Sequence, residues 1–547
     1  MPLLRWLLAL VLLVTLWLSL GLPALGFLVC LVPPHEPPPA VRQSVREEDG
    51  VYRCGESERR WVGDDGGGVW HLRCAGDPAA LGWAQGALVG DLTVRLEGEM
   101  MDTFTTLVPG FLARHALLGL VGLNGRTLPR FYHADEMTEI AACVAGTEAT
   151  WPTWRSSVPH PTRAIQYHAL HDISHYLIDN PLVRVPQIGC TAVAVRGSRA
   201  AGGGLLVGRL FDFEGGREFD VSKVVRSVRP AQGLAWLSVG WAGLAGAVTG
   251  MNEAGLWVSI NAGESSGQGS VGRPIILVAR EILQSCRTIA EAEAILRAAP
   301  VFVSEAVLLA SGPEARAVVV EVGPTGCDVR AMADDRLVVT NHFLTPRWSD
   351  DPANQRRLAE GTSPRRYARA MELLDATPLQ TPTTLLEVLR DRRALGGQEV
   401  GFGNRGTINA WIGAHLVVAD LTRQVVWVCE APHGLGRAWA FGLDGPLGES
   451  PLPASVDRER CVQLAGPWAR ALRDARRLHA AGDHAGAARA AAEAAALNPD
   501  HFESHEVVAL TATDPAQRAT AARRALSLQP AYPEDRQRSE RLLAGTP

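Results

Sequence analysis

The stretch "VPQIGCTAVAVRG", Val185 to Gly197, places a cysteine directly after a glycine and before an alternating apolar run. The alternation and the β-branched residues predict a strand that begins next to Cys190. A thiol in the middle of a chain has a pKa of about 8.5 and is mostly protonated at neutral pH, so a catalytic cysteine needs a base. No papain-like C-G-x-C-W signature surrounds Cys190, and the sequence therefore does not indicate a histidine base.

Cutting the bond between Gly189 and Cys190 would supply the base from the chain itself. The new α-amino group would lie beside the thiol, and its pKa of about 7.7–8.0 suits proton transfer near neutral pH. Threonine uses its own N-terminal amine in the same way. Because Gly189 has no Cβ, it lets the thiol approach the preceding carbonyl in a tight turn. We therefore predict self-cleavage between these two residues.

Composition and charge exclude several classes of function. The chain has 547 residues, enough for two or three domains, and its 47% hydrophobic content indicates mostly globular structure. The formal net charge is −5 and no basic block occurs, which excludes sequence-independent binding to nucleic acid. The nine cysteines include no CxxC pair, which argues against a zinc ribbon. One helical face is expected to carry four candidate metal ligands, His168, His171, Asp172 and His175. Neither HExxH nor a motif with a third ligand follows them, so we predict no metal and no cofactor.

The N-terminus is a long apolar run, "LLRWLLALVLLVTLWLSLGLPALGFLVCLV", in which only Arg5 is charged. It is longer than the ~20 residues that a membrane-spanning helix needs. We predict an uncleaved transmembrane anchor over residues 1–33, and the positive-inside rule favours an extracytoplasmic body. In that compartment a disulfide between Cys54 and Cys74 is a hypothesis.

Changes of composition divide the rest of the chain. We predict a spacer and propeptide over residues 34–189 and a catalytic domain over residues 190–450. The second of these contains short β-rich runs in consecutive groups with helical stretches between them, which predicts an α+β fold of antiparallel sheets covered by helices. Within it, "RALGGQEVGFGNRGT", Arg393 to Thr407, predicts a mobile loop near the site.

The C-terminal tail, residues 466–547, is rich in Ala, Arg and Leu. Two segments repeat the frame A-x-x-A-L-x-P at a separation of 31 residues, from Pro499 to Pro530. This pattern predicts helices that resemble tetratricopeptide repeats, whose period is about 34. Such arrays usually need three copies, so a plain helical tail is an equal alternative. A protein partner at this tail is a further hypothesis.

A set of motifs then resembles a known family. "GCTAVAV", "GRLFDF", "GMNEAGLWVSINAG", "TNHF" and "SPRRYARAMELL" follow one another between Cys190 and about Cys429. The set resembles the acyl-coenzyme A:6-aminopenicillanate acyltransferase group, the C45-type autoproteolytic acyltransferases and hydrolases. These are N-terminal-nucleophile (Ntn) hydrolases related to choloylglycine hydrolase and acid ceramidase. "LRCAGDPAALGWAQG", Leu72 to Gly86, resembles the opening of the family's propeptide.

The resemblance implies a four-layer αββα sandwich and a role for each matching residue. Cys190 would be the nucleophile and its freed amine the base. Asp212 would orient that amine, and Arg209 would keep the carboxylate ionised. Considered alone, an Arg-Asp pair at a strand end is more often structural.

Three further residues complete the implied site. Asn261 matches an asparagine of the oxyanion hole, and Asn341 matches a second family asparagine. Arg366 matches an arginine after the family's serine, although Arg365 beside it leaves the register ambiguous by one residue. Asn252, in contrast, is expected to be a turn residue.

The function predicted from these observations is an autoproteolytic zymogen that becomes a cysteine amidohydrolase or acyltransferase. It would act on linear amide C–N bonds of small N-acyl substrates through an acyl-thioester at Cys190. Two alternatives stay open, a papain-like peptidase and a non-catalytic membrane-anchored scaffold that acts through its tail. Ile188, where the penicillin acyltransferases tend to carry aspartate, does not favour penicillin as the substrate.

Overall fold

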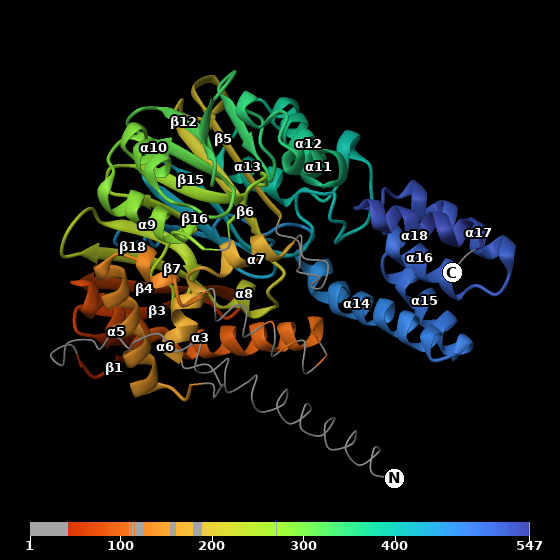
Figure 1. Cartoon of the computed structure of the whole chain (residues 1–547), viewed down its shortest axis with the longest axis horizontal. Coiled ribbons are helices and arrows are strands. Elements are labelled where there is room, and N and C mark those ends of the chain that lie inside the picture. The colour runs from red at the N-terminus through yellow and green to blue at the C-terminus, as the bar shows by residue number, and fades with distance from the viewer. Residues whose placement is uncertain are drawn as a thin grey trace, which may run out of the picture.

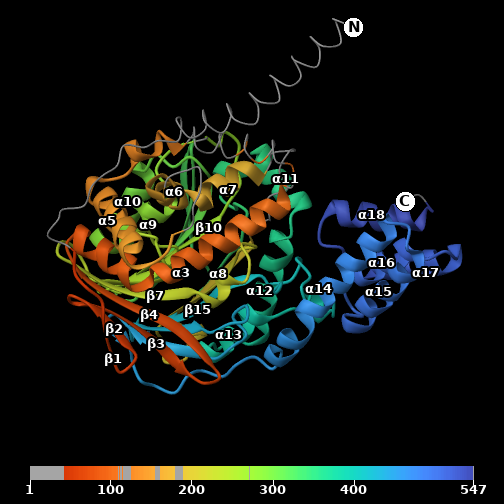
Figure 2. The same cartoon turned by 90° about the horizontal axis from the view of Figure 1, so that it is seen from below.

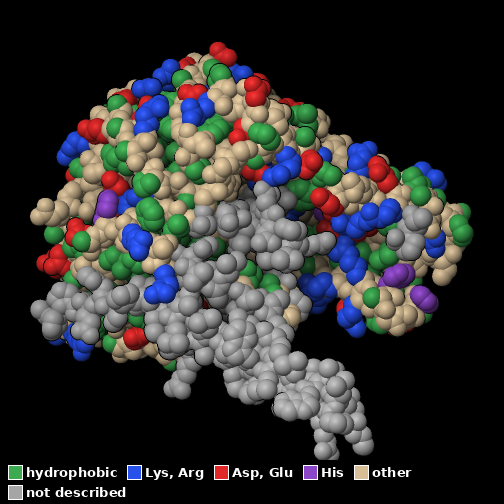
Figure 3. All heavy atoms as spheres, viewed as in Figure 1, with side chains coloured by type: hydrophobic (Ala, Val, Ile, Leu, Met, Phe, Trp, Pro, Cys, Tyr) green, Lys and Arg blue, Asp and Glu red, His purple; other side chains and the backbone are tan. Residues whose placement is uncertain are grey.

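The structure is a computed structural model that describes residues 42–108, 110, 114, 117, 125–153, 160–178, 189–269 and 271–545. Figure 1 shows a body that holds all of the strands and a smaller tail that is made of helices. Figure 3 shows acidic and basic side chains interspersed over the visible face of the body. That distribution fits the small net charge of the sequence.

The larger sheet of the body has eleven strands among the described residues, in the order β1-β2-β3-β4-β7-β8-β9-β10-β11-β12-β13. All neighbours are antiparallel except β4 and β7, which run parallel. The strands are β1 Arg46–Glu48, β2 Val51–Cys54, β3 Ser57–Asp64, β4 Gly67–Gly76, β7 Lys223–Pro230, β8 Trp236–Trp241, β9 Thr249–Asn252, β10 Leu256–Ala262, β11 Glu305–Ser311, β12 Arg316–Gly323 and β13 Gly326–Ala331. The first four strands were not predicted, and through them the segment before Cys190 extends the same sheet.

The smaller sheet has seven strands in the described residues, in the order β14-β5-β6-β15-β16-β17-β18, and every pair is antiparallel. Its strands are β5 Gly189–Arg196, β6 Leu205–Asp212, β14 Arg336–Val339, β15 Gly413–Asp420, β16 Val425–Cys429, β17 Ala438–Gly442 and β18 Gly445–Pro446. The predicted strand that begins next to Cys190 is therefore confirmed as β5.

The two sheets pack face to face over a shared apolar core. Alternate side chains of a strand point to opposite faces, so Ala192 and Ala194 of β5 meet Val225, Leu237 and other residues of the larger sheet. The intervening Val193 and Val195 point outward and contact helices α12 Ser363–Ala376 and α13 Pro382–Arg390. The outer face of the larger sheet is covered by α3 Pro78–Leu107, α5 Ala134–Thr150, α6 His160–Tyr167, α7 Leu170–Ile178, α9 Ile275–Ser285 and α10 Ile289–Ala298.

The layers are thus helices, sheet, sheet and helices, as Figures 1 and 2 show. The predicted mixed α+β class is confirmed. Two short helices complete the body, α8 Glu218–Val221, which contacts β7 and β15, and α11 Pro352–Glu360.

The predicted disulfide between Cys54 and Cys74 is wrong in this structure, where both are buried free thiols. Cys54 ends β2 and Cys74 lies in β4, with β3 between them. Two strand spacings amount to about 9.5 Å, whereas bridged cysteines have Cα atoms less than about 7 Å apart.

The predicted transmembrane anchor, residues 1–33, lies outside the described residues. Among the residues that the structure does describe, no helix is both long enough and apolar enough to cross a bilayer.

The tail consists of five described helices and begins earlier than predicted, at Arg458. They are α14 Arg458–Ala480, α15 His484–Leu497, α16 Phe502–Thr511, α17 Pro515–Ser527 and α18 Pro533–Leu543. Helix starts follow from capping, because Asp483 accepts a hydrogen bond from Gly486 N and Asp514 accepts one from Gln517 N. Small alanines, among them Ala475 and Ala491, let the helices approach closely. The helical prediction is confirmed, and the tetratricopeptide character stays a prediction.

Candidate active site

Cys190 lies at the start of β5 and is fully buried. Its main-chain N–H donates a 2.8 Å hydrogen bond to Asn341 Oδ1. Burial raises the pKa of the thiol, and the nearby Arg209 guanidinium opposes that rise. An unaided thiol at this place is therefore protonated at neutral pH and has to lose its proton to a base before it can attack.

Arg209, on β6, lies beside the thiol, with Nη2 3.8 Å from Cys190 Sγ. Its guanidinium also lies 4.4 Å from the centre of the Phe211 ring. Further donors of the same group bind Thr249 Oγ1 at 2.6 Å and Asn261 Oδ1 at 3.3 Å. Although burial lowers the pKa of Arg209 to about 10, the group stays charged at neutral pH and favours a thiolate at Cys190.

Asp212 ends β6 and lies opposite Gly189 in the antiparallel register. Burial raises the pKa of Asp212 to about 7, and Arg366, Arg405 and Arg209 lower it in that order. Its Oδ1 is buried without a hydrogen-bond partner in the described structure. An amine on residue 190 would give this carboxylate both a donor and a positive charge.

Arg209 lowers the pKa of Asp212 as expected, but Arg366 and Arg405 lower it more. Positions 209 and 212 differ by an odd number, so their side chains point to opposite faces of β6. Arg209 therefore contacts Cys190 and Asn261, while Arg366 contributes the largest favourable charge at Asp212.

Arg366, on α12, resolves the ambiguity of register. Its Nη1 donates to Cys190 O at 2.6 Å and its Nη2 donates to Asn341 Oδ1 at 2.6 Å. Arg365 points elsewhere and donates to Pro530 O in the tail. Pro364 in the first turn of α12 fixes where this helix begins, and so which of the two arginines faces the site.

Asn341 follows β14, and its side-chain amide bonds both to Cys190 and to the strand that carries Asn261. Its Oδ1 accepts from Cys190 N and Arg366, while its Nδ2 donates to Ala262 O at the end of β10. Asn261 lies one residue earlier on β10, fully buried, and its Nδ2 has no acceptor in the described structure. That donor is free for a developing oxyanion. Asn252 is confirmed as a turn residue, since its Oδ1 accepts from Ala254 N and Leu256 N.

Of the four candidate metal ligands, His168 and Asp172 bond main-chain atoms, and the side chain of His175 lies outside the described part of the structure. His168 Nδ1 lies 2.7 Å from Ala164 O, and its Nε2 accepts a hydrogen bond from Ala245 N. Asp172 Oδ1 accepts from Ile275 N. No cluster of metal-ligating side chains occurs in the part of the chain that the structure describes.

His171 and Glu305 form a pair near the site that the sequence did not reveal. His171 Nε2 lies 2.8 Å from Glu305 Oε1, and both residues are buried. Burial lowers the pKa of His171, but the Glu305 carboxylate outweighs it and the net pKa is raised. Glu305 is paired with Ala262 across the sheet, next to Asn261. The pair thus ties α7, from the segment before the predicted cut, to the strand that carries Asn261.

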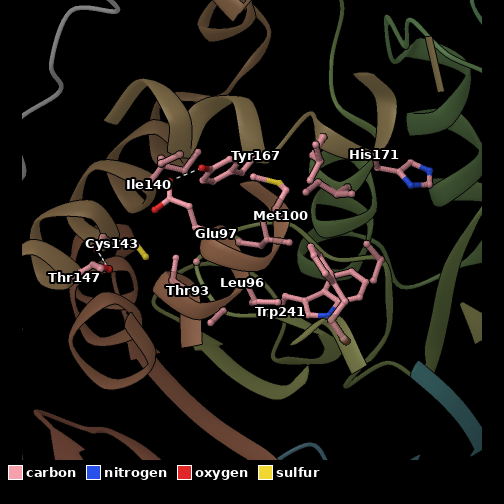
Figure 4. Close-up of a pocket in the computed structure, with 18 of the residues that line it drawn as sticks. Thr93, Leu96, Glu97, Met100, Ile140, Cys143, Thr147, Tyr167, His171 and Trp241 are labelled. Atoms are coloured by element: carbon pink, nitrogen blue, oxygen red, sulfur yellow. Dashed lines mark hydrogen bonds between the residues drawn. The ribbon is translucent and has the colours of Figure 1, made fainter. Parts of the chain in front are cut away.

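An apolar cavity of about 90 Å³ opens beside the site (Figure 4). Phe211, which pairs with Cys190 across the sheet, forms one wall. Another part of the wall comes from α3 and α5 and includes Leu96, Met100 and Ile140. At the polar end Glu97 accepts hydrogen bonds from Arg163 and Tyr167. Helices that precede the predicted cut therefore supply much of this cavity.

An α+β body with a buried cysteine at a strand start and this arrangement of Arg, Asp and Asn residues is a candidate acyl-transfer enzyme. Residues 202–400 match the family model described as acyl-coenzyme A:6-aminopenicillanic acid acyl-transferase. The match confirms the resemblance predicted from the motifs over these residues, and it supports an enzyme of the amidohydrolase and acyltransferase type. The matched segment begins after Cys190 and contains the five other candidate site residues, Arg209, Asp212, Asn261, Asn341 and Arg366.

No curated protein matches the chain. Similar solved structures include the Caenorhabditis elegans ortholog of N-acylethanolamine-hydrolyzing acid amidase, with 17% identity and a TM-score of 0.33 over 44% of this chain and 100% of that one. Two variants of conjugated bile acid hydrolase from Clostridium perfringens each have 14% identity. Their TM-scores are 0.33 and 0.32, over 47% and 48% of this chain and 94% and 98% of theirs. Likenesses at this identity and score bear on neither substrate nor mechanism.

Proposed function

We propose that this chain is a self-cleaving cysteine Ntn hydrolase that acts on linear amide C–N bonds through an acyl-thioester at Cys190. The observation that carries the proposal is the set of contacts around residue 190. Its N–H is held by Asn341, its carbonyl by Arg366 and its thiol by Arg209, while Gly189 faces the unsatisfied Asp212. Every group that would flank a new N-terminus is in place around an unbroken strand.

Self-cleavage would proceed in two steps. Cys190 Sγ attacks the carbonyl carbon of Gly189, and the C–N bond to residue 190 breaks as its nitrogen takes a proton, which leaves a thioester and a free amine. Water then hydrolyses the thioester, giving a carboxylate on Gly189 and a free thiol on Cys190. The amine that remains would pair with Asp212, whose Oδ1 has no partner in the uncut chain.

Turnover of a substrate would use the same atoms. The α-amine takes the thiol proton, and the thiolate attacks the substrate amide. Asn261 Nδ2 donates to the oxyanion, a contribution that is typically worth 10²–10³ in rate. The ammonium then protonates the leaving amine, and the acyl-thioester passes its acyl group to water or to a second amine. The apolar cavity beside Phe211 favours an apolar acyl group.

The alternative of a papain-like peptidase has less support. His171 is held by Glu305, and His415 Nε2 lies 3.1 Å from both Arg209 and Thr249 Oγ1. Burial keeps the pKa of His415 well below its ordinary value, so the residue is a poor proton acceptor. The non-catalytic scaffold would leave the charged groups around Cys190 without a role. Membrane attachment through residues 1–33, an extracytoplasmic body and a protein partner at the tail stay proposals.

A mass measurement of the thioester tests this function. Purified protein is mixed with N-acyl p-nitroanilides of increasing acyl length, quenched in acid after seconds and analysed by intact mass. We expect the fragment that begins at Cys190 to gain the acyl mass, and we expect hydroxylamine to remove it. Wild type that neither releases nitroaniline nor gains the acyl mass, for any acyl length, would refute the proposal.

A further inference from the structure

The loop from Arg393 to Thr407, predicted to be mobile, is held between the body and the tail. Phe402 N donates to Asn498 Oδ1 at 3.3 Å, and Asn498 Nδ2 donates back to Phe402 O at 2.9 Å. Asn404 Nδ2 donates to Gln529 O at 3.3 Å. Figures 1 and 2 both show the tail beside α11 and α12, and Arg365 of α12 donates to Pro530 O of the tail. The tail is thus fixed to a loop of the body at both α15 and the turn before α18.

Arg405, which belongs to the same loop, lies next to the candidate site. It forms an ion pair with Glu214, just after β6. Burial lowers the pKa of Arg405, while the tail residue Tyr532 and the site residue Asp212 raise it. Arg405 thus lies close to both the carboxylate opposite Gly189 and the tail, since Arg405, Asp212 and Tyr532 line one small cavity.

A second, smaller cavity lies where these groups meet. Its volume is about 10 Å³, the size of a single water molecule. Its walls are Gly189, Asp212, Arg357, Thr362, Arg366, Arg405, Ala410, Ile412 and Tyr532. Tyr532 is the tail's contribution to these walls, and it also packs on the tail's own apolar cluster around Phe502 and Leu528. Tyr532 lies outside residues 202–400, which match the family model, and yet it closes the space next to the predicted cleavage site.

We propose that the helical tail is part of the active site and that Tyr532 is the residue that limits the size of the amine-side group of a substrate. The inference rests on the proposed function. The α-amine of Cys190 has to come within about 2.6–3.2 Å of the leaving nitrogen to give it a proton. Once Gly189 has departed, the space that it vacates next to that amine opens into this cavity. The substituent on the leaving nitrogen then meets the Tyr532 ring.

Replacing Tyr532 tests this wall without requiring turnover. Full-length wild type, Tyr532→Ala, Tyr532→Phe and Val507→Ala are treated with iodoacetamide or with N-phenylmaleimide. Rates of modification at Cys190 are read from the mass of its peptide. The phenyl group of the second reagent matches the ring that Tyr532→Ala removes. Tyr532→Phe keeps the ring, and Val507→Ala loosens the tail core without touching the cavity, because Val507 is fully buried within the tail.

The quantity compared is the ratio of the modification rate with N-phenylmaleimide to the rate with iodoacetamide. We expect this ratio to be about tenfold or more higher in Tyr532→Ala than in wild type, because a pocket discriminates by size on this scale. Both controls are expected to stay within about twofold of wild type. An unchanged ratio in Tyr532→Ala, or an equal rise in Val507→Ala, would overturn the assignment. Intact mass of the same samples reports whether the chain is cut after Gly189, so a failure of the proposed function is recognised separately.

Discussion

Gly189 lies opposite Asp212 at the open end of the β5–β6 pair, and a Cβ added to Gly189 would lie 3.2 Å from Asp212 Oδ2. The close approach explains the glycine before the proposed nucleophile. A methyl group here would press on a buried carboxylate that is already held among charged neighbours.

We expect Gly189→Ala to slow self-cleavage by about tenfold or more, because a small displacement of reacting groups has a large effect on rate. The measurement is the fraction of uncut chain against time after synthesis in a cell-free system. Gly98→Ala is the control, since nothing lies within 4 Å of a Cβ at that position. Equal rates in both variants and wild type would contradict a crowded cleavage site.

Asn261→Ala removes the amide donor that we assign to the oxyanion. We expect kcat to fall by about 10²–10³ while KM changes little, because the donor acts on charge that develops in the transition state. Asn252→Ala is a matched control, since this buried asparagine bonds a turn and the end of α9 Ile275–Ser285 and none of the candidate site residues. A similar loss of kcat in both variants would indicate a general loss of structure rather than a lost donor.

Asp212 is expected to make stability depend on pH in the uncut chain. An aspartate in the unfolded chain is ionised above about pH 3.9, whereas folding raises the pKa of Asp212 to about 7. Between these values the folded state holds the extra proton, so the contribution of Asp212 to the free energy of unfolding falls as pH rises.

This effect is measured in the Cys190→Ala background, which keeps the chain uncut. The difference in free energy of unfolding, Asp212→Asn minus the parent, should grow between pH 4 and pH 7 by up to about 4 kcal/mol and then level off. Urea denaturation at several pH values gives this difference. A difference that stays constant with pH would contradict a raised pKa at Asp212.

The apolar cavity is expected to set the preference for the acyl group. Val144→Phe adds a ring in the wall formed by α5. We expect kcat/KM to fall about tenfold or more for long-chain or phenylacyl p-nitroanilides, with little change for the acetyl compound. Val388→Phe, on α13 and away from the cavity, controls for overpacking. An unchanged ratio of long to short substrates would place the acyl group elsewhere.

The sequence predicted the catalytic half of the fold better than the segment before it. β5 and β6 are visible as short apolar runs, because both faces of each strand are buried, one against the other sheet and one against helices. The strands between Arg46 and Gly76 were missed because glycines and charged residues interrupt them, as in "SERRWVGDDGGGVW". The parallel pairing of β4 with β7 joins residues about 150 positions apart in sequence, and no local pattern reveals it.

The candidate site, like the fold, was predicted only in part from the sequence. Motif residues from four strands or loops and one helix do meet around Cys190, but their pairing depends on which way each side chain points. Strand alternation turns Arg209 toward the thiol of Cys190, so Arg366 contributes the largest favourable charge at Asp212. Tyr532 and Glu305 carried no signal, because only tertiary packing brings them to the site.

The most direct test is the intact mass of purified full-length protein, measured beside the Cys190→Ala variant under denaturing conditions. Our account predicts two fragments in wild type, the first ending at Gly189 and the second beginning with a free amine on Cys190, and one continuous chain in the variant. A wild-type protein that turns over amide substrates while its chain remains continuous through residues 189 and 190 would contradict it.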